Sequence, residues 1–349
     1  MYNNFKTDIT AFADKCGDYF KSGKLKRFFN SLCSDRDMTA YYDIFAEHCD
    51  GGKRVRAYLV KLGYELFSAQ FDERIILPAL SYEIFQTGVL AHDDIIDESP
   101  TRRHKPSMHI DLGGGHTGVS RAICQGDLGI IAATAILCGS DFDEKTKLKA
   151  IEHQTRVFFS TVAGELKDVD LSYSENYTLD DVLSMYALKT AQYTVSGPLL
   201  LGAILGGADS ETQNQLYHIG QNIGIAFQIK DDILGVFSDQ EKTGKSSLSD
   251  MREGKKTVLS SHFIERAEAE QNENAAAEFQ SIYGNAASGE EQLKILRNLL
   301  NEYDSQDFAN NLCQVYIDKA RTDLSRLEIS KNSKLIFEEF LEYMTSRDK

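Results

Sequence analysis

The strongest chemical signal in the sequence is a cluster of aspartates. Asp93, Asp94 and Asp97 end an apolar stretch whose spacing predicts a helix. On a helix, Asp93 and Asp97 are one turn apart and share a face, with nothing nearby to neutralise them. Carboxylates gathered at the C-terminal end of a helix repel each other and oppose the helix dipole, so this arrangement indicates a bound cation. Mg²⁺ is commonly bound through one or two carboxylates together with substrate phosphates.

A second pair of aspartates repeats the pattern later in the chain. Asp231 and Asp232 lie in the segment 227–235, again inside an apolar helical stripe. Either pair alone is weak evidence, because adjacent aspartates are common. Two such pairs on facing helices of a bundle predict a carboxylate-lined cavity that holds several Mg²⁺ ions.

Basic residues stand where a phosphate-bearing ligand would need them. Lys53 and Arg56 are three residues apart and are predicted to share one face of a helix that begins here, whose exposed amides also attract anions. Arg102 and Arg103 follow the first aspartate cluster, and arginine makes bidentate contacts with phosphate. Further cations are Lys189, Lys245, Lys255 and Lys256. Together they predict two anion sites, one bridged by metal and one purely basic.

The elements that carry these residues are predicted to be helices. Apolar residues recur at three- and four-residue steps through most of the 349 residues, and the stripe at 211–237 is too long for a strand. None of the four prolines lies beyond Pro198, which disfavours a turn-rich β fold. We expect residues 1–349 to form one all-α domain, a bundle of about a dozen helices around a central cavity.

Composition excludes several classes of protein. A net charge of −15 disfavours nucleic-acid binding, which needs a basic surface. The longest apolar run, 193–208, is too short and interrupted to span a bilayer. The six cysteines form no C-x-x-C pair and the N-terminus is polar, which is typical of a cytoplasmic protein with reduced thiols. The sequence contains no nucleophile elbow, P-loop or H-E-x-x-H motif.

These motifs together resemble those of the polyprenyl synthetase family, the trans-isoprenyl diphosphate synthases. In order they are G-G-K-R-V-R from Gly51, D-D-I-I-D-E-S-P-T-R-R, Gly126-Asp127, Lys189-Thr190, F-Q-I-K-D-D-I-L-G, and G-K before D-M-R-E-G-K-K-T. The resemblance implies the isoprenoid synthase type I fold. It also implies a Mg²⁺-dependent prenyltransferase that adds isopentenyl diphosphate head-to-tail to dimethylallyl, geranyl or farnesyl diphosphate.

The resemblance also implies roles for individual residues. Three Mg²⁺ ions per active site would be held by Asp93, Asp97 and Asp231. The catalytic set would be Asp93, Asp94, Asp97, Lys189, Thr190, Gln228, Asp231 and Asp232. The substrate-binding set would be Lys53, Arg56, Gln86, Arg102, Arg103, Lys189, Gln228, Lys245 and Lys255. Isopentenyl diphosphate would be held by Lys53, Arg56, Gln86 and Arg103. The released diphosphate would accept the proton, which fits the absence of an obvious protein base.

The chain departs from the family pattern at three positions. The second aspartate motif ends in Gly235 rather than aspartate, so Asp231 carries more of the metal binding. His104 stands where glycine is usual, and Glu165 stands where glutamine is usual. The roles of His104 and Glu165 stay open.

Residues before the first aspartate cluster bear on product length. In the family, bulky aromatics four and five positions before the first aspartate stop growth at fifteen carbons. Here those positions hold Val89 and Gly88, which are small enough to let the chain grow further. One turn deeper, Phe85 is large enough to stop its growth. We therefore expect geranylgeranyl diphosphate. The alternative is that Gly88 only permits close packing of a neighbouring helix.

Other functions were weighed against this one. If Val89, Gly88 and Phe85 do not set the product length in this way, the product is farnesyl diphosphate or a longer polyprenyl diphosphate. A class I terpene cyclase would carry an N-D-x-x-S-x-x-x-E helix and would lack Lys53 and Arg56. A non-catalytic synthase subunit tends to lose the first aspartate motif, which is intact here. An acidic interaction protein would not need paired aspartates in apolar helices. Family analogy also implies a homodimer.

Overall fold

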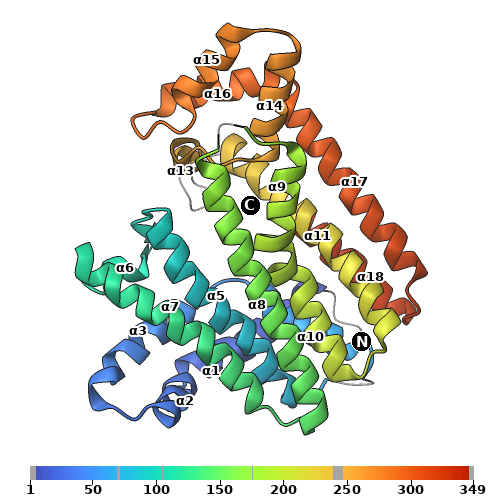
Figure 1. Ribbon diagram of the computed structural model, residues 1–349. Helices are drawn as coiled ribbons and strands as arrows, with labels where there is room; N and C mark the ends of the chain where they lie inside the picture. Colours follow the sequence, from blue (N-terminus) through green and yellow to red (C-terminus); the bar gives the residue numbers. More distant parts are fainter. Residues whose placement is uncertain (1–4, 69–70, 104, 175, 239–246, 346–349) are drawn as a thin grey trace. The chain divides into compact units, whose positions relative to one another are not determined.

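The computed structural model describes residues 5–68, 71–103, 105–174, 176–238 and 247–345. Nearly all of these residues are helical, and the strands among them are a single two-stranded hairpin, in which β1 (Thr101–Arg102) pairs antiparallel with β2 (Lys105–Pro106) (Figure 1). The all-α prediction is confirmed. His104 and Lys245 lie outside the described residues.

The chain divides into two compact units, each built from separate stretches of sequence. The first unit comprises Met1–Val157, Gly197–Tyr217 and Ile329–Ile336. Its complete helices are α1 (Phe5–Lys21), α2 (Lys24–Leu32), η1 (Arg36–Met38), α3 (Thr39–Cys49), α4 (Val55–Glu65), η2 (Glu73–Ile75), α5 (Ile76–Ile96), α6 (Met108–Asp111), α7 (Gly115–Cys138) and α10 (Gly197–Gly206). The predicted single domain stays a prediction.

The second unit comprises Phe158–Ser196, His218–Glu328 and Phe337–Lys349. Its complete helices are α9 (Leu179–Tyr186), the π-helix η3 (Ala187–Ser196), α13 (Ser247–Glu253), α14 (Val258–Ala269), α15 (Glu273–Ile282), α16 (Glu290–Glu302) and α17 (Ser305–Arg326). Three long helices contribute to both units: α8 (Glu144–Ser172), α11 (Ser210–Phe237) and α18 (Lys331–Thr345).

Glycines let the central helices of the first unit pack with their backbones in direct contact. Helix α5 runs along α7, and α4 runs along α10. A Cβ added to Gly88 of α5 would lie 2.8 Å from the carbonyl oxygen of Gly126 in α7. A Cβ on Gly63 of α4 would overlap with the backbone of Leu199 in α10. Because helix axes approach this closely only where side chains are absent, these glycines fix the position of α5, which carries the first aspartates.

By length and composition alone, α7 is apolar enough to cross a membrane. The helix nevertheless packs against α5 as a core element of the first unit, and core helices of water-soluble proteins often have such a composition. The composition of α7 is therefore weak evidence for a membrane span, and the expected lack of an integral membrane segment stays a prediction.

The π-helix η3 is the local feature that positions Lys189 and Thr190. A π-helix is wider than an α-helix and occurs frequently at functional sites. Its backbone packs directly against glycines of two neighbouring helices. A Cβ on Gly164 of α8 would lie 2.6 Å from the Cα of Lys189. A Cβ on Gly224 of α11 would lie 2.5 Å from the Cα of Ala191. These glycines make room for the widened turn.

Candidate active site

The first aspartate cluster is held by an arginine. Helix α5 ends at Ile96, and Asp97 is its C-cap residue. The Arg102 side chain donates from Nη2 to Asp93 Oδ2 at 2.7 Å and from Nε to Asp94 Oδ1 at 2.7 Å. The expectation that nothing neutralises Asp93 was wrong, because the β1 hairpin folds Arg102 back over the end of the helix.

The donor chemistry of these aspartates fits Mg²⁺. Asp93 and Asp97 offer carboxylate oxygens one turn apart, and Asp231 on α11 is exposed. Within the described ranges, no group of three or more His, Cys, Asp or Glu side chains surrounds a common metal position. A closed cluster is not required, since Mg²⁺ takes its remaining ligands from water and substrate phosphates. Asp93 and Asp231 belong to different units, so their facing each other stays a prediction.

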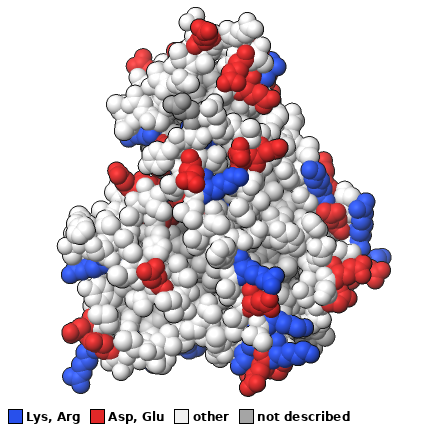
Figure 2. All heavy atoms as spheres, in the orientation of Figure 1, with Lys and Arg blue, Asp and Glu red and all other residues white. Residues whose placement is uncertain are grey.

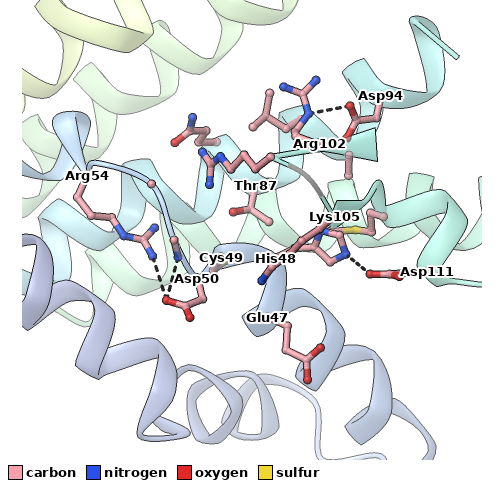
Figure 3. A pocket seen from close by; sticks show the side chains of 17 residues that line it. Glu47, His48, Cys49, Asp50, Arg54, Thr87, Asp94, Arg102, Lys105 and Asp111 are labelled. Carbon is pink, nitrogen blue, oxygen red and sulfur yellow. Dashed lines mark hydrogen bonds and ion pairs between the residues drawn. The ribbon is translucent and has the colours of Figure 1, made fainter. Parts of the chain in front are cut away.

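A cavity of about 310 Å³ lies in the first unit beside this cluster. Figure 3 shows Asp94, Arg102, Arg54 and Lys105 around it. Of the predicted isopentenyl diphosphate residues, Gln86 and Arg103 line the cavity, whereas Lys53 and Arg56 are not part of its lining. The placement of Lys53 and Arg56 on one helix face was wrong, because α4 begins at Val55 after a left-handed residue and Lys53 precedes it.

The cavity wall holds three arginines and a lysine, together with the carboxylates of Glu47, Asp50, Asp94 and Asp111. Burial lowers the pKa of Arg103, Glu83 opposes that effect, and the nearby Arg54, Arg56 and Arg102 lower it further. The Arg103 guanidinium packs against Gly52, where a Cβ would lie 3.2 Å from Nη1. A cluster of guanidinium groups that repel one another is a binding site for an anion of several charges.

Arg54 was overlooked at the sequence level. Its side chain is buried and donates from Nη1 to Glu83 Oε2 at 3.1 Å, while the other carboxylate oxygen of Glu83 accepts the Ala57 N–H at 3.1 Å. This ion pair ties the glycine-rich loop to α5. A glutamate on the buried face of a predicted helix was the available signal, since such a group needs a partner.

In the second unit, Lys189 is held by two carboxylates of α8. Its Nζ lies 2.9 Å from Glu165 Oε2 and 2.6 Å from Asp168 Oδ2. Glu165, whose role was open, therefore contacts the lysine predicted to bind diphosphate. Lys255, by contrast, pairs with Glu253 at 3.0 Å.

Thr190 and Gln228 are joined in a hydrogen-bonded chain. The Thr190 hydroxyl donates to Gln228 Oε1 at 2.8 Å, and Gln228 Nε2 donates to Asp232 Oδ1 at 2.9 Å. Tyr186 Oη donates to the other oxygen of Asp232. Asp232 therefore has partners within the second unit, and it is less exposed than its neighbour Asp231. The two adjacent aspartates have different surroundings.

The predicted chain-length residues have different surroundings on α5. Gly88 contacts the backbone of α7, so a larger side chain there would displace a helix instead of filling a cavity, and the role proposed for Gly88 was wrong. Val89 is half-buried and lies one turn before Asp93 on the same face of α5. Phe85 is fully buried. His92 Nε2 hydrogen-bonds to the Ile123 carbonyl at 3.0 Å.

Comparison with known proteins identifies the family. The family described as polyprenyl synthetase matches residues 38–300 of the chain. The chain belongs to the polyprenyl synthetase family. Membership makes the protein a trans-prenyltransferase of the isoprenyl diphosphate synthase type.

Members of the polyprenyl synthetase family with established names are similar over most of their length. A geranylgeranyl diphosphate synthase of Sulfolobus acidocaldarius is 31% identical, over 82% of this chain and 83% of its own. A geranylfarnesyl diphosphate synthase of Aeropyrum pernix is 31% identical, over 86% of this chain and 91% of its own. The structure of a geranylgeranyl pyrophosphate synthase of Corynebacterium glutamicum has a TM-score of 0.88 at 26% identity, covering 99% and 100% of the two chains.

Proposed function

We propose that the protein condenses isopentenyl diphosphate with an allylic diphosphate in a Mg²⁺-dependent reaction, and that its main product is geranylgeranyl diphosphate. The observation that carries this proposal is the arginine-lined cavity beside the first aspartate cluster, where Arg102 bridges Asp93 and Asp94 and Arg103 faces the cavity. That arrangement provides a carboxylate site suited to a metal next to a cavity that Arg54, Arg102 and Arg103 line. The similar Corynebacterium enzyme was crystallised with isoprenyl diphosphate and magnesium.

In this proposal each side of the reaction has its own residues. When bound, Mg²⁺ would supply positive charge opposite the leaving diphosphate. Asp93, Asp97 and Asp231 would hold the metal, and Arg102 and Lys189 would bind the diphosphate itself. Arg102 and Lys189 exchange their carboxylate partners for phosphate oxygens when the substrate binds. Gln86 and Arg103 hold isopentenyl diphosphate, with Lys53 and Arg56 nearby.

The length of the product is proposed from α5 and from the relatives. Val89 has a small side chain on the Asp93 face, which leaves room for the chain below the metal site. Each further turn of α5 lengthens that room by about 5.4 Å. Several similar proteins are named geranylgeranyl diphosphate synthases. Geranylfarnesyl diphosphate is the second candidate, because the Aeropyrum relative is a geranylfarnesyl diphosphate synthase of equal similarity.

The test is to size the products. Purified protein is incubated with labelled isopentenyl diphosphate, Mg²⁺ and each allylic starter in turn: dimethylallyl, geranyl or farnesyl diphosphate. We expect chains of twenty carbons as the main product, and shorter chains from Val89→Phe, whose ring lies below the metal site. An unchanged product from Val89→Phe contradicts the proposed direction of chain growth. Cyclic hydrocarbons as products contradict the proposed reaction.

We further propose that the protein acts as a homodimer in the cytoplasm. The outer face of α8 carries an apolar stripe in which Phe159 is 77% exposed, Leu166 is 64% exposed and Val162 lies between them. On α7, Leu128 and Ile131 are also exposed, and the surface along α7 is mostly uncharged in Figure 2. Exposed apolar stripes of this kind are typical of surfaces buried between subunits.

A further inference from the structure

A directed chain of hydrogen bonds runs through the second unit to Thr190. It begins at the backbone N–H of Val258, which donates to Tyr186 Oη at 3.1 Å. Tyr186 donates to Asp232, which also accepts from Gln228 Nε2 at 2.9 Å. Gln228 Oε1 accepts from the Thr190 hydroxyl at 2.8 Å. Every one of these contacts lies within a single compact unit.

The two arms of the chain meet at Asp232, and a backbone N–H orients the Tyr186 arm. Val258 is the first residue of α14, and its N–H is one of the amides that have no acceptor inside the helix. A backbone N–H only donates, so Tyr186 Oη accepts there and its own proton is left for Asp232. Burial raises the pKa of Tyr186 well above its ordinary range, which keeps that proton in place.

The same reasoning fixes the amide of Gln228. A carboxylate has only acceptors, so the Gln228 group facing Asp232 must be the NH₂. The amide oxygen of Gln228 is consequently turned to Thr190 and takes its hydroxyl proton. The lone pairs of Thr190 Oγ1 therefore point away from Gln228.

We propose that Asp232 and Tyr186 are positioning residues that turn the lone pairs of Thr190, instead of its proton, toward the allylic cation. This inference rests on the proposed function, in which Lys189 binds the allylic diphosphate, and Thr190 is the next residue along η3. Oriented dipoles stabilise a developing charge without reorganising during the reaction, and a reversed hydroxyl would oppose the cation. Asp232 thus acts through Gln228, while Asp231 carries the metal.

The decisive variant is Asp232→Asn, which has nearly the same shape. Its amide NH₂ faces Gln228 and turns the Gln228 amide over, so that Gln228 donates to Thr190 Oγ1 and the hydroxyl proton points elsewhere. We expect kcat to fall about 10²-fold, the typical effect of losing one oriented group, with little change in the allylic KM. Tyr186→Phe should lower kcat less, since Gln228 still contacts Asp232.

A double-mutant cycle separates orientation from a general structural role. In Thr190→Val, which has no hydroxyl to orient, adding Asp232→Asn should lower kcat by less than about threefold. Thr190→Ser keeps the hydroxyl and should respond to Asp232→Asn as the wild type does. Asp318→Asn is the matched control, because Asp318 accepts from Gln314 at the same i,i+4 spacing on exposed α17. It should leave kcat unchanged.

Several results would overturn the inference. One is equal losses from Asp232→Asn in the wild-type and Thr190→Val backgrounds. Another is a shift in the Mg²⁺ concentration for half-maximal activity in Asp232→Asn, which would make Asp232 a metal ligand. Thermal unfolding of each variant identifies losses caused by misfolding, and Tyr186→Phe then provides the second cycle with Thr190→Val. Failure of the wild type to elongate any starter refutes the proposed function itself.

Discussion

At the scale of single residues, charge compensation explains how the site exists without substrate. Asp93 and Asp94 share Arg102, and Lys189 is shared by Glu165 and Asp168. Each of these cations has anionic partners in the protein that a diphosphate can replace. The spacing of acids and bases in the sequence predicted basic residues beside the first aspartate cluster, and Arg102 lies there. It did not predict these pairings, because they join residues on different elements.

The first aspartate is the residue whose loss should matter most. Asp93→Ala should lower turnover by several orders of magnitude, because stabilisation of the transition-state charge by a metal is worth several kcal/mol. The measurement is steady-state turnover at saturating Mg²⁺. Asp37→Ala, at an exposed position of η1, is the control and should behave as wild type. Near-normal turnover of Asp93→Ala would remove this residue from the metal site.

At the scale of elements, helix periodicity predicted the position of a long helix, but it did not predict local departures from α-helical geometry. The stripe at 211–237 corresponds to α11, which spans Ser210–Phe237. The π-helix η3 was not predictable, since a widened turn leaves no spacing signal and depends on glycines of other helices. The packing of Gly88 against a neighbouring helix was the alternative that the sequence left open, because spacing does not tell which neighbour a residue meets.

Gly164 should be essential to the position of Lys189. Gly164→Ala places a methyl group against the Lys189 backbone, so we expect about 1–3 kcal/mol of destabilisation and a fall in kcat. Gly17→Ala is the control, since a Cβ there meets nothing within 4 Å, and removing a helical glycine should stabilise by about 0.5–1 kcal/mol. Denaturant unfolding and kinetics measure both. Equal stabilities of the two variants would contradict the close approach of η3 and α8.

The contact between α8 and α10 should make stability depend on pH. Burial lowers the pKa of His153 below 6.5, and its Nε2 bonds to the Gly197 carbonyl at 2.8 Å. Below pH 6.5 the unfolded chain therefore binds a proton at this residue that the folded protein resists, and the free energy of unfolding decreases. His153 contributes its full stability above that pH and loses it as the pH falls.

Thermal unfolding at pH 7.5 and pH 5.5 tests this dependence. His153→Gln should lose less stability between the two pH values than the wild type does. His116→Gln, at an exposed position of α7, should respond as the wild type. The account of His153 fails if the two variants lose the same amount.

At the scale of the whole molecule, the exposed stripe of α8 predicts assembly. The wild type should have twice the mass of the 39.1 kDa chain in light scattering at micromolar concentration. Phe159→Lys should shift it toward the monomer, because a charge in an apolar interface is costly to bury. Leu335→Lys, an equally drastic change at an exposed position of α18, should leave the dimer intact. A monomeric wild type would contradict the proposal.

The central claim is that the protein condenses isopentenyl diphosphate with an allylic diphosphate in a Mg²⁺-dependent reaction, which releases the diphosphate of the allylic substrate. It is tested most directly by measuring diphosphate release from farnesyl diphosphate with and without isopentenyl diphosphate. We predict one diphosphate released for each isopentenyl diphosphate consumed in the presence of Mg²⁺, and almost none when either isopentenyl diphosphate or Mg²⁺ is withheld. Rapid release without isopentenyl diphosphate, or undiminished turnover in excess chelator, would contradict the account.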